Sequence, residues 1–122
     1  MTQYTTVTLI PGTTYGTPSG NYDGSSQDWL GNAVPAANYY GGQGALQTIT
    51  YRLQNFEGNF VIEATLNDTP DGVSWFEVDR YGDGSSIVTI THPVSVIGNF
   101  AWIRARVENF SSGTILNVTA AY

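Results

Sequence analysis

The chain has 122 residues, enough for one domain with a single hydrophobic core. Charged residues make up only 11% of it, and ten Asp and Glu against four Arg, with no Lys, give a net charge of −6 at pH 7. This balance excludes non-specific binding to nucleic acid and to anionic membranes, because both need a basic surface. The absence of Cys excludes disulfides, thiol nucleophiles and thiolate metal sites.

The beginning of the chain carries no targeting signal that the sequence can identify. Met1 to Tyr4 has neither the basic region nor the apolar region of a secretory signal. No apolar run approaches the roughly 20 residues that a membrane-spanning helix needs. We therefore expect a protein that is made in a reducing cytoplasm and that lies outside the membrane.

Residues 1–10 are expected to form an N-terminal strand over Tyr4 to Ile10, and residues 11–45 an irregular arm or loop. The arm holds more than half of the glycines of the chain and half of its tyrosines, and no helical or strand period survives in it. Flexible linkers seldom carry aromatic residues, so Trp29, Tyr39 and Tyr40 favour an ordered surface segment. A small domain has little spare core, so we expect a neighbouring subunit to cover these rings and a sandwich without the arm to fold.

Residues 46–122 show the period-two alternation of β-strands, interrupted by turn signals rich in Gly, Asn and Asp. The expected strands lie around Ile49 to Leu53, Asn59 to Asn67, Val73 to Arg80, Ile87 to Thr91, Val94 to Ile97, Phe100 to Glu108 and Thr114 to Tyr122. The expected turns include Glu57 to Asn59 and Ser111 to Gly113. With the N-terminal strand this makes about eight strands, which predicts one all-β domain over residues 1–122, an antiparallel sandwich or jelly roll.

One face of these strands is expected to form the core. The alternation assigns to it Ile62, Ala64, Leu66, Ile103, Ala105, Val107, Leu116 and Val118. The opposite face of the strand at Phe100 to Glu108 carries Trp102, Arg104 and Arg106. These three residues have two interpretations: a structural ladder or an anchor for a carboxylate of a partner. In the ladder the arginines would pair with Glu63, Glu77 or Glu108 and stack on Trp102.

Candidate catalytic groups are few. His92 is the only histidine, and one His without Cys makes neither a zinc site nor a convincing relay next to Pro93. Glu63 and Glu77 are the plausible acid pair for glycoside hydrolysis, but solvent-facing residues of a sheet have the same pattern. We expect a protein that is not an enzyme, with no catalytic residues and no cofactor.

Two ligand classes stay open at this level. The Asp-rich turns at Asn67 to Gly72 and at Asp79 to Gly84 could offer oxygen ligands to calcium, although neither has EF-hand spacing and Asp-Gly is ordinary turn chemistry, so no metal site is assigned. An aromatic content of 13% also permits a carbohydrate-binding module in which rings stack on sugars. The alternative is that these aromatic rings fill a small core.

A family resemblance covers the chain from about Asn38 to the C-terminus. It is carried by the sequence runs Asn38 to Gly41, Leu46 to Thr48, Asn55 to Gly58, Ile62 to Leu66, Ser74 to Phe76, Trp102 to Val107 and Gly113 to Ile115. This pattern resembles a β-sandwich module of virion structural proteins of tailed phages, especially those that infect marine cyanobacteria. Its motifs are structural and carry no catalytic residues, and residues 1–37 and 81–86 lie outside it.

The resemblance implies a non-enzymatic virion protein, most simply a capsid decoration or head accessory protein; a neck, tail or fibre protein and a carbohydrate-binding module are the alternatives. Such a protein is synthesised in the host cytoplasm and then located in the virion, with other virion proteins and copies of itself as partners. Edge strands are normally protected by Lys, which this chain lacks, so an edge is expected to be covered by another chain. The expected contact residues are Trp29, Tyr39, Tyr40, Trp102, Arg104 and Arg106, together with the residue 1–10 strand.

Overall fold

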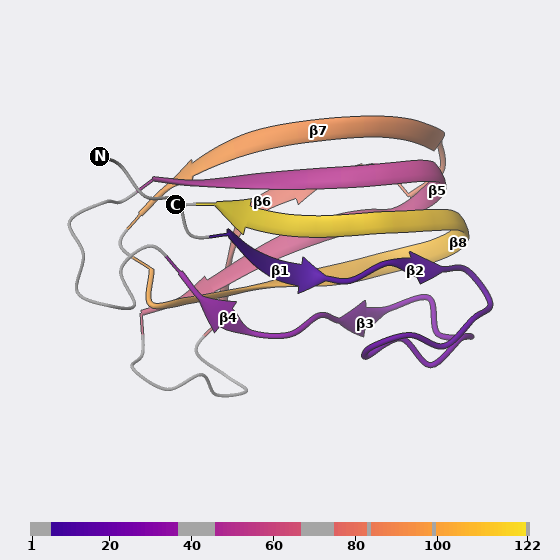
Figure 1. The fold of residues 1–122 in the computed structure, drawn as a ribbon, viewed down its shortest axis with the longest axis horizontal. Helices are drawn as coiled ribbons and strands as arrows, with labels where there is room; N and C mark the ends of the chain where they lie inside the picture. The colour runs from indigo at the N-terminus through magenta and orange to yellow at the C-terminus, as the bar shows by residue number, and fades with distance from the viewer. Residues whose placement is uncertain (1–5, 37–45, 67–74, 83, 99, 122) are drawn as a thin grey trace.

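A computed structural model describes residues 6–36, 46–66, 75–82, 84–98 and 100–121. These residues form one sheet of eight antiparallel strands and contain no helix, which confirms the predicted all-β, sandwich-like fold (Figure 1). The strands are β1 (Thr6–Ile10), β2 (Thr13–Thr14), β3 (Trp29–Leu30), β4 (Val34–Pro35), β5 (Leu46–Thr65), β6 (Phe76–Tyr81), β7 (Ile87–Ile97) and β8 (Trp102–Ala121).

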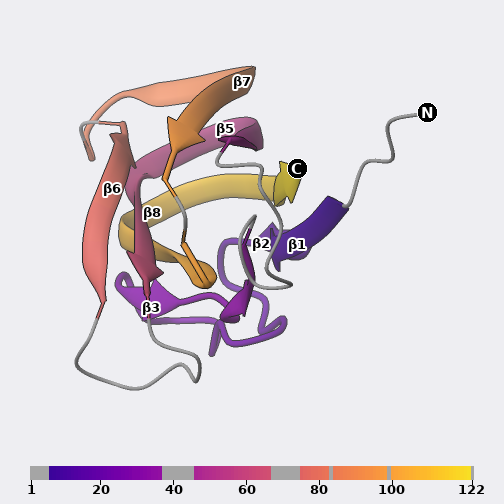
Figure 2. The same cartoon turned by 90° about the vertical axis from the view of Figure 1, so that its left-hand side faces the viewer.

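Two strands of 20 residues each, β5 and β8, form the axis of the sheet. They pair with each other from Thr48 and Ala121 at one end to Thr65 and Trp102 at the other. The other edge of β5 binds β7 along its first half and β6 along its second half. The other edge of β8 binds β1, β2, β3 and β4 in turn. Figure 2 shows that the sheet curls over, so its two halves face each other as layers of a sandwich.

The curl is made where β5 and β8 bend side by side. Asn55 and Asn109 have φ angles of 53° and 56°, and Gly58 and Gly113 have φ angles of 152° and 89°. The register of the β5–β8 pair shifts between Gln54 and Asn59, as expected for β-bulges, which bend and twist a strand. The structure has one continuous strand through each of the expected turns at Glu57 to Asn59 and Ser111 to Gly113, so the division into separate strands at these positions is wrong. A positive φ serves a bulge as well as a turn, and here β5 and β8 stay paired while they bend back together (Figure 1).

Two other segments are more regular than the sequence predicted. Residues 87–97 form a single strand through His92 and Pro93, where two strands were expected. Proline is tolerated in an edge strand, because its missing N–H can face away from the neighbouring strand. At the other edge of the sheet, the arm expected at residues 11–45 contributes three short strands, β2, β3 and β4, instead of staying irregular.

The core contains most of the residues that the alternation predicted. Ile62, Ala64, Ile103, Ala105, Val107 and Val118 are at most 1% exposed. Leu66 and Leu116, however, are 63% and 47% exposed, so their assignment to the core was wrong. Leu116 is the extra residue of a bulge, since Arg52 pairs with Asn117 and Leu53 with Ile115, and Ile115 takes the core position. Leu66 follows the last residue of β5.

Aromatic rings run through the core as a chain of contacts that includes residues of the expected arm. Tyr22 and Trp29 are 1% and 8% exposed, and both contact the ring of Phe110, at centroid distances of 5.2 and 6.3 Å. Phe110 contacts Phe56 at 5.6 Å, and Phe56 stacks on Phe60 at 4.8 Å. The expectation that a neighbouring subunit covers Trp29 is therefore wrong, because the bent β8 offers this ring an apolar surface within the same chain.

One side of the sandwich is held closed by backbone hydrogen bonds. The N–H of Gly31 donates to the carbonyl of Ala105 at 2.7 Å, and the N–H of Asn32 donates to the carbonyl of Leu9 at 3.3 Å. On the opposite side, β6 and β7 both pair with β5 but not with each other. None of the described residues belongs to a helix that is long and apolar enough to cross a membrane.

Candidate functional site

Three arginines and three glutamates lie together on the outer face of β5, β6 and β8, where they form a charge cluster. Its members are Glu63, Glu77, Arg80, Arg104, Arg106 and Glu108. The cluster includes every residue of the predicted Arg–Glu ladder. Strand pairing explains it, because Glu63 is the Cα partner of Arg104 on β8 and of Glu77 on β6.

Glu63 is the centre of the charge cluster. Its carboxylate accepts a hydrogen bond from Arg104 Nε at 2.8 Å and lies 3.3 Å from Arg106 Nη1. The residue is only 7% exposed. A buried carboxylate is stable only when it is paired, and two guanidinium groups supply that pairing here. Arg104 and Arg106 thus already hold a carboxylate within the chain, as the ladder interpretation predicts. Their contact with a partner stays a prediction.

The outer part of the charge cluster is more exposed. Arg80 Nη2 lies 2.9 Å from Glu77 Oε1, and its Nη1 lies 3.2 Å from Glu108 Oε1. The hydrogen bond between Arg80 and Glu77 lowers the pKa of the Glu77 carboxyl and raises the pKa of the Arg80 guanidinium. Glu77 is therefore held in its ionised form. A general acid for glycoside hydrolysis needs a raised pKa instead, so Glu77 lacks this feature.

Arg104 also stacks on an aromatic ring. Its guanidinium carbon lies 4.2 Å from the centroid of Trp75, the residue just before β6. The expected partner for this stacking was Trp102, so for Arg104 the ring is a different tryptophan. Trp102 itself is half-buried at the start of β8. Sequence spacing could not identify Trp75, because the contact depends on how β6 pairs with β5.

His92 lies on the inner face of β7 among aromatic rings. Its ring stacks on Tyr81 at 4.6 Å and on Tyr51 at 6.2 Å. The hydroxyl of Tyr51 donates a hydrogen bond of 2.9 Å to Asp79 Oδ2. Burial, followed by the charge of Asp79, raises the pKa of Tyr51 well above its ordinary value. These contacts give His92 a packing role.

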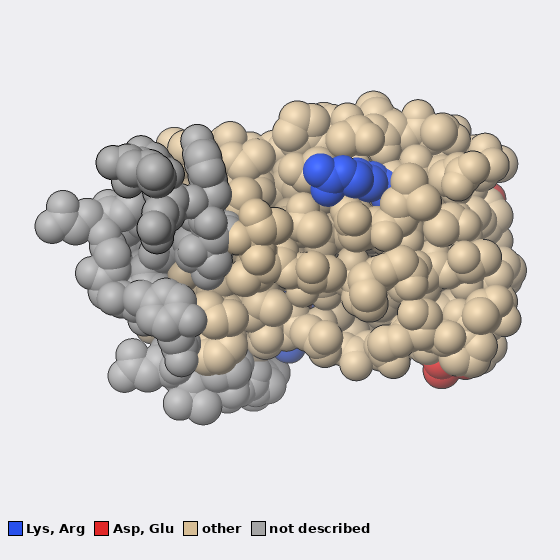
Figure 3. Space-filling model, viewed as in Figure 1, with Lys and Arg blue, Asp and Glu red and all other residues tan. Residues whose placement is uncertain are grey.

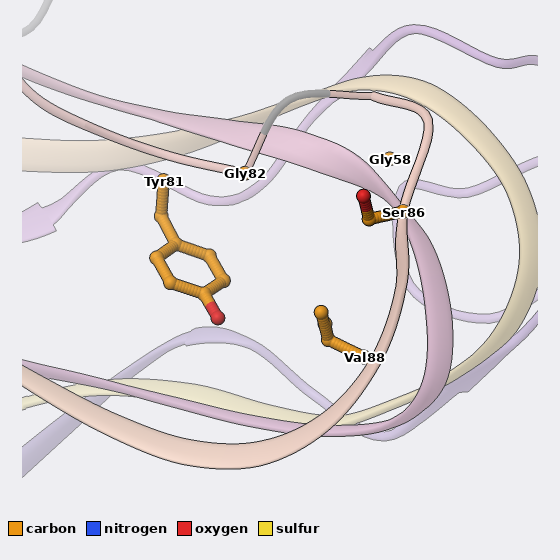
Figure 4. A pocket seen from close by; sticks show the side chains of 5 residues that line it. All are labelled: Gly58, Tyr81, Gly82, Ser86 and Val88. Atoms are coloured by element: carbon orange, nitrogen blue, oxygen red, sulfur yellow. The ribbon is translucent and has the colours of Figure 1, made fainter.

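A pocket of about 300 Å³ lies on the side of the sandwich where β6 and β7 are not paired. It is lined by Gly58, Tyr81, Gly82, Ser86 and Val88, and Figure 4 shows the Tyr81 and Val88 side chains directed into it from different strands. The lining is uncharged and offers two hydroxyl groups. Its volume is at the lower end of small-molecule sites.

The described residues contain no group of three His, Asp or Glu side chains that could hold a metal ion. Asp79, one of the calcium candidates, accepts the Tyr51 hydrogen bond. The other candidate positions, Asn67 to Gly72 and Asp83, lie outside the described residues, as do Tyr39, Tyr40 and Tyr4.

The outer face of β1, β8, β5 and β7 is rich in hydroxyl groups. Thr8, Thr119 and Thr50 lie side by side on neighbouring strands, and Thr48 is paired with Ser95. Arg52 lies on this face and donates a hydrogen bond of 3.0 Å to Asn117 Oδ1. Figure 3, viewed from this side of the molecule, shows few charged atoms. The face offers hydroxyl groups for polar contacts.

The free edge of β7 is a feature that the sequence indicated only in general terms. Among the described strands, β7 pairs with β5 alone, so its second edge has no strand partner. Its 11 residues include no charged Asp, Glu, Lys or Arg. Ile87 and Ile97 are 63% and 76% exposed. A long uncharged edge of this kind is a template for pairing with another strand.

A scan against models of protein families finds no match for this chain, and a search of the curated proteins finds none either. The functional argument therefore starts from the surfaces themselves. Of these, the charge cluster is occupied by its own ion pairs, and the edge of β7 is open.

Proposed function

We propose that this protein is a non-enzymatic structural subunit of a tailed-phage virion, most simply a capsid decoration or head accessory protein. The observation that carries the proposal is the uncharged, unpaired edge of β7 with Ile87 and Ile97 exposed at its ends. An edge of this kind favours strand addition by another protein chain. The resemblance of residues 38–122 to a virion β-sandwich module is the reason for proposing that this other chain belongs to a phage particle.

The charge cluster supports the same role through rigidity. Ion pairs among its six side chains join the outer faces of β5, β6 and β8. A subunit that repeats many times on a shell multiplies a weak contact by avidity, provided that each copy presents the same geometry. A net charge of −6 also keeps assembled particles apart in solution.

The proposal is tested by locating the protein on particles. Antibodies raised against the purified chain should label virions by electron microscopy, with gold over the head for a decoration protein. Gold label over the neck, tail or fibres would instead support one of the alternative locations in the virion. Virions that carry neither label nor the protein by mass spectrometry would refute the proposal.

A binding experiment with purified components gives a second test. Purified protein should co-sediment with heads that lack it and saturate at a fixed number of copies. Retardation in polysaccharide affinity gels without binding to heads would instead support the carbohydrate-binding alternative.

A further inference from the structure

The sequence of β7 reads nearly the same in both directions. His92 stands at the centre of the 11 residues, and four of the five residue pairs at equal distances on its two sides match in kind. The matched pairs are Ile87 with Ile97, Val88 with Val96, Thr89 with Ser95 and Ile90 with Val94, while Thr91 stands opposite Pro93. In antiparallel orientation, a second copy of this strand therefore meets residues of its own kind at every position except Thr91 and Pro93.

The faces of the strand obey the same symmetry. The register with β5 places Thr91 and Ser95 on the outer face, opposite Arg52 and Thr48, and places Ile90 and Val94 on the inner face, opposite Leu53 and Ile49. Paired residues lie on the same side of an antiparallel sheet. Two copies of β7 would therefore continue both the polar outer face and the apolar inner face without a mismatch.

The position of Pro93 fits the free edge. A proline within a sheet is accommodated where its missing N–H faces away from the neighbouring strand. Residues two apart direct their backbone groups to the same side, so Thr89, Thr91 and Ser95 are expected to present N–H and C=O groups to the free edge. Pro93 offers only its C=O on this side, so each Thr91–Pro93 pair would form one hydrogen bond instead of two, and the other residues of the edge supply the remaining donors and acceptors.

The inner face of β7 is also incompletely covered. Ile90 points to the core side of the sheet but is 39% exposed, and Val88 lines the pocket between β6 and β7. The opposite side of the sandwich is closed by the hydrogen bond between Asn32 and Leu9. A second copy on β7 would place a strand with its own Val94 and Val96 beside these residues. Such a contact removes apolar surface from water.

We propose that two copies of this chain pair antiparallel along their β7 edges, about a two-fold axis that passes between their His92 residues. The occupant is a second copy rather than a different protein because the edge is self-complementary in sequence and carries no charge that would repel its own image. An interface of this kind is isologous, as in most homodimers. The proposal deepens the proposed function, because it names a second copy of this chain as the chain that adds to the β7 edge, and it is measured on purified protein without particles.

The register makes the proposal testable by exchanging charges. Ile87 of one copy lies opposite Ile97 of the other, and both side chains are exposed, so charged substitutions leave the core intact. The variants I87K/I97K and I87E/I97E place like charges opposite each other at both ends of the interface. The variant I87K/I97E places opposite charges there, and its net charge equals that of the wild type.

Sedimentation velocity over a micromolar concentration series gives the readout, with far-UV circular dichroism as the check of folding. We expect a dimer for the wild type and for I87K/I97E, and a shift to monomer by at least tenfold in dissociation constant for both like-charge variants. L66K, at an exposed leucine beyond the end of β5, is the matched control and should stay dimeric.

Two results would overturn the pairing. A wild type that stays monomeric at its highest soluble concentration would show that the edge does not pair with itself. Equal behaviour of I87K/I97E and I87K/I97K would show that Ile87 and Ile97 do not meet across a two-fold axis. Either result leaves the labelling of virions unaffected, so failure of the dimer and failure of the virion role are distinguishable.

Discussion

At the scale of single residues, Glu63 determines how the outer face of the sheet is held together. Its carboxylate is nearly buried and is bound by Arg104 and Arg106 from the neighbouring strand. The pairs that Arg80 makes with Glu77 and Glu108 are much more exposed. Burial increases the cost of breaking an ion pair, because the remaining charge loses its partner away from water.

We expect Glu63→Gln to destabilise the protein far more than Glu77→Gln. Removing one partner of a buried pair costs about 3 to 5 kcal/mol, and the partial exposure of Arg106 places Glu63→Gln at the lower end of that range. Water screens the exposed pair between Glu77 and Arg80, so Glu77→Gln should have little effect on the free energy of unfolding. Urea unfolding of the two variants measures the difference, and equal costs would show that the charge cluster is not held by Glu63.

The raised pKa of Tyr51 predicts that the protein loses stability at alkaline pH. Its pKa in the fold is raised by burial and by Asp79, while in the unfolded chain a tyrosine has a pKa of about 10. Above pH 10 the unfolded chain loses this proton and the folded chain keeps it, so the free energy of unfolding falls as the pH rises. One proton corresponds to a slope of about 1.4 kcal/mol per pH unit.

Tyr51→Phe removes this proton and should reduce the alkaline slope by that amount. Urea unfolding at several pH values between 9 and 11 gives the slope for both proteins. The other tyrosines contribute equally to both, so the difference isolates Tyr51. Parallel slopes would mean that the Tyr51 hydroxyl is accessible to solvent in the fold.

At the scale of elements, the bends of β5 and β8 decide the architecture. Gly113 has a φ angle of 89°, and a Cβ at this position would overlap the carbonyl of Asn55 on the facing strand. Gly16 has a similar φ angle of 86°, but a Cβ there meets no atom within 4 Å. A residue with a Cβ would therefore meet the same backbone strain at both positions, but in different surroundings.

We expect Gly113→Ala to cost substantially more than Gly16→Ala. Both substitutions place a side chain in the left-handed region, at about 1 to 2 kcal/mol. Only Gly113→Ala also forces β5 and β8 apart, which should add at least about 2 kcal/mol to the loss of unfolding free energy. Thermal unfolding of the two variants measures the difference. A similar loss in both would mean that the bend tolerates a wider separation of the strands.

The elements also show how far the sequence predicts the fold. Alternation identified the inner residues wherever a strand is regular, as at Ile62 and Ala64 or at Ile103 and Ala105. It failed at Leu116, because Leu116 is the extra residue of a bulge in β8, which shifts the register by one residue and reverses the faces. The turn signals at Gly58 and Gly113 led to the wrong division of β5 and β8. Glycine with a positive φ is typical of both bulges and turns, so the sequence does not distinguish the two.

At the scale of the whole molecule, the candidate site was predictable in its chemistry but not in its place. The absence of Lys and the outward Arg104 and Arg106 are visible in the sequence. The free edge is not, because it depends on β7 pairing with β5 and not with β6. Trp29 was assigned to a surface for a related reason: its burial depends on a contact with Phe110, which is far away in sequence, as well as on the nearby Tyr22.

The N-terminal segment is consequently expected to be part of the folding unit. Trp29→Ala removes a buried ring that contacts Tyr22 and Phe110, and should cost about 3 to 5 kcal/mol. Trp29→Phe keeps an aromatic ring and removes the indole N–H, which is buried without a hydrogen-bond partner among the described residues, so it should cost less. Tyr15→Ala, at a ring that is 45% exposed, is the control and should cost less than Trp29→Ala. Urea unfolding monitored by circular dichroism gives all three values. If Trp29→Ala were as stable as the wild type, residues 11–45 would be a separable arm, and a sandwich without them would fold.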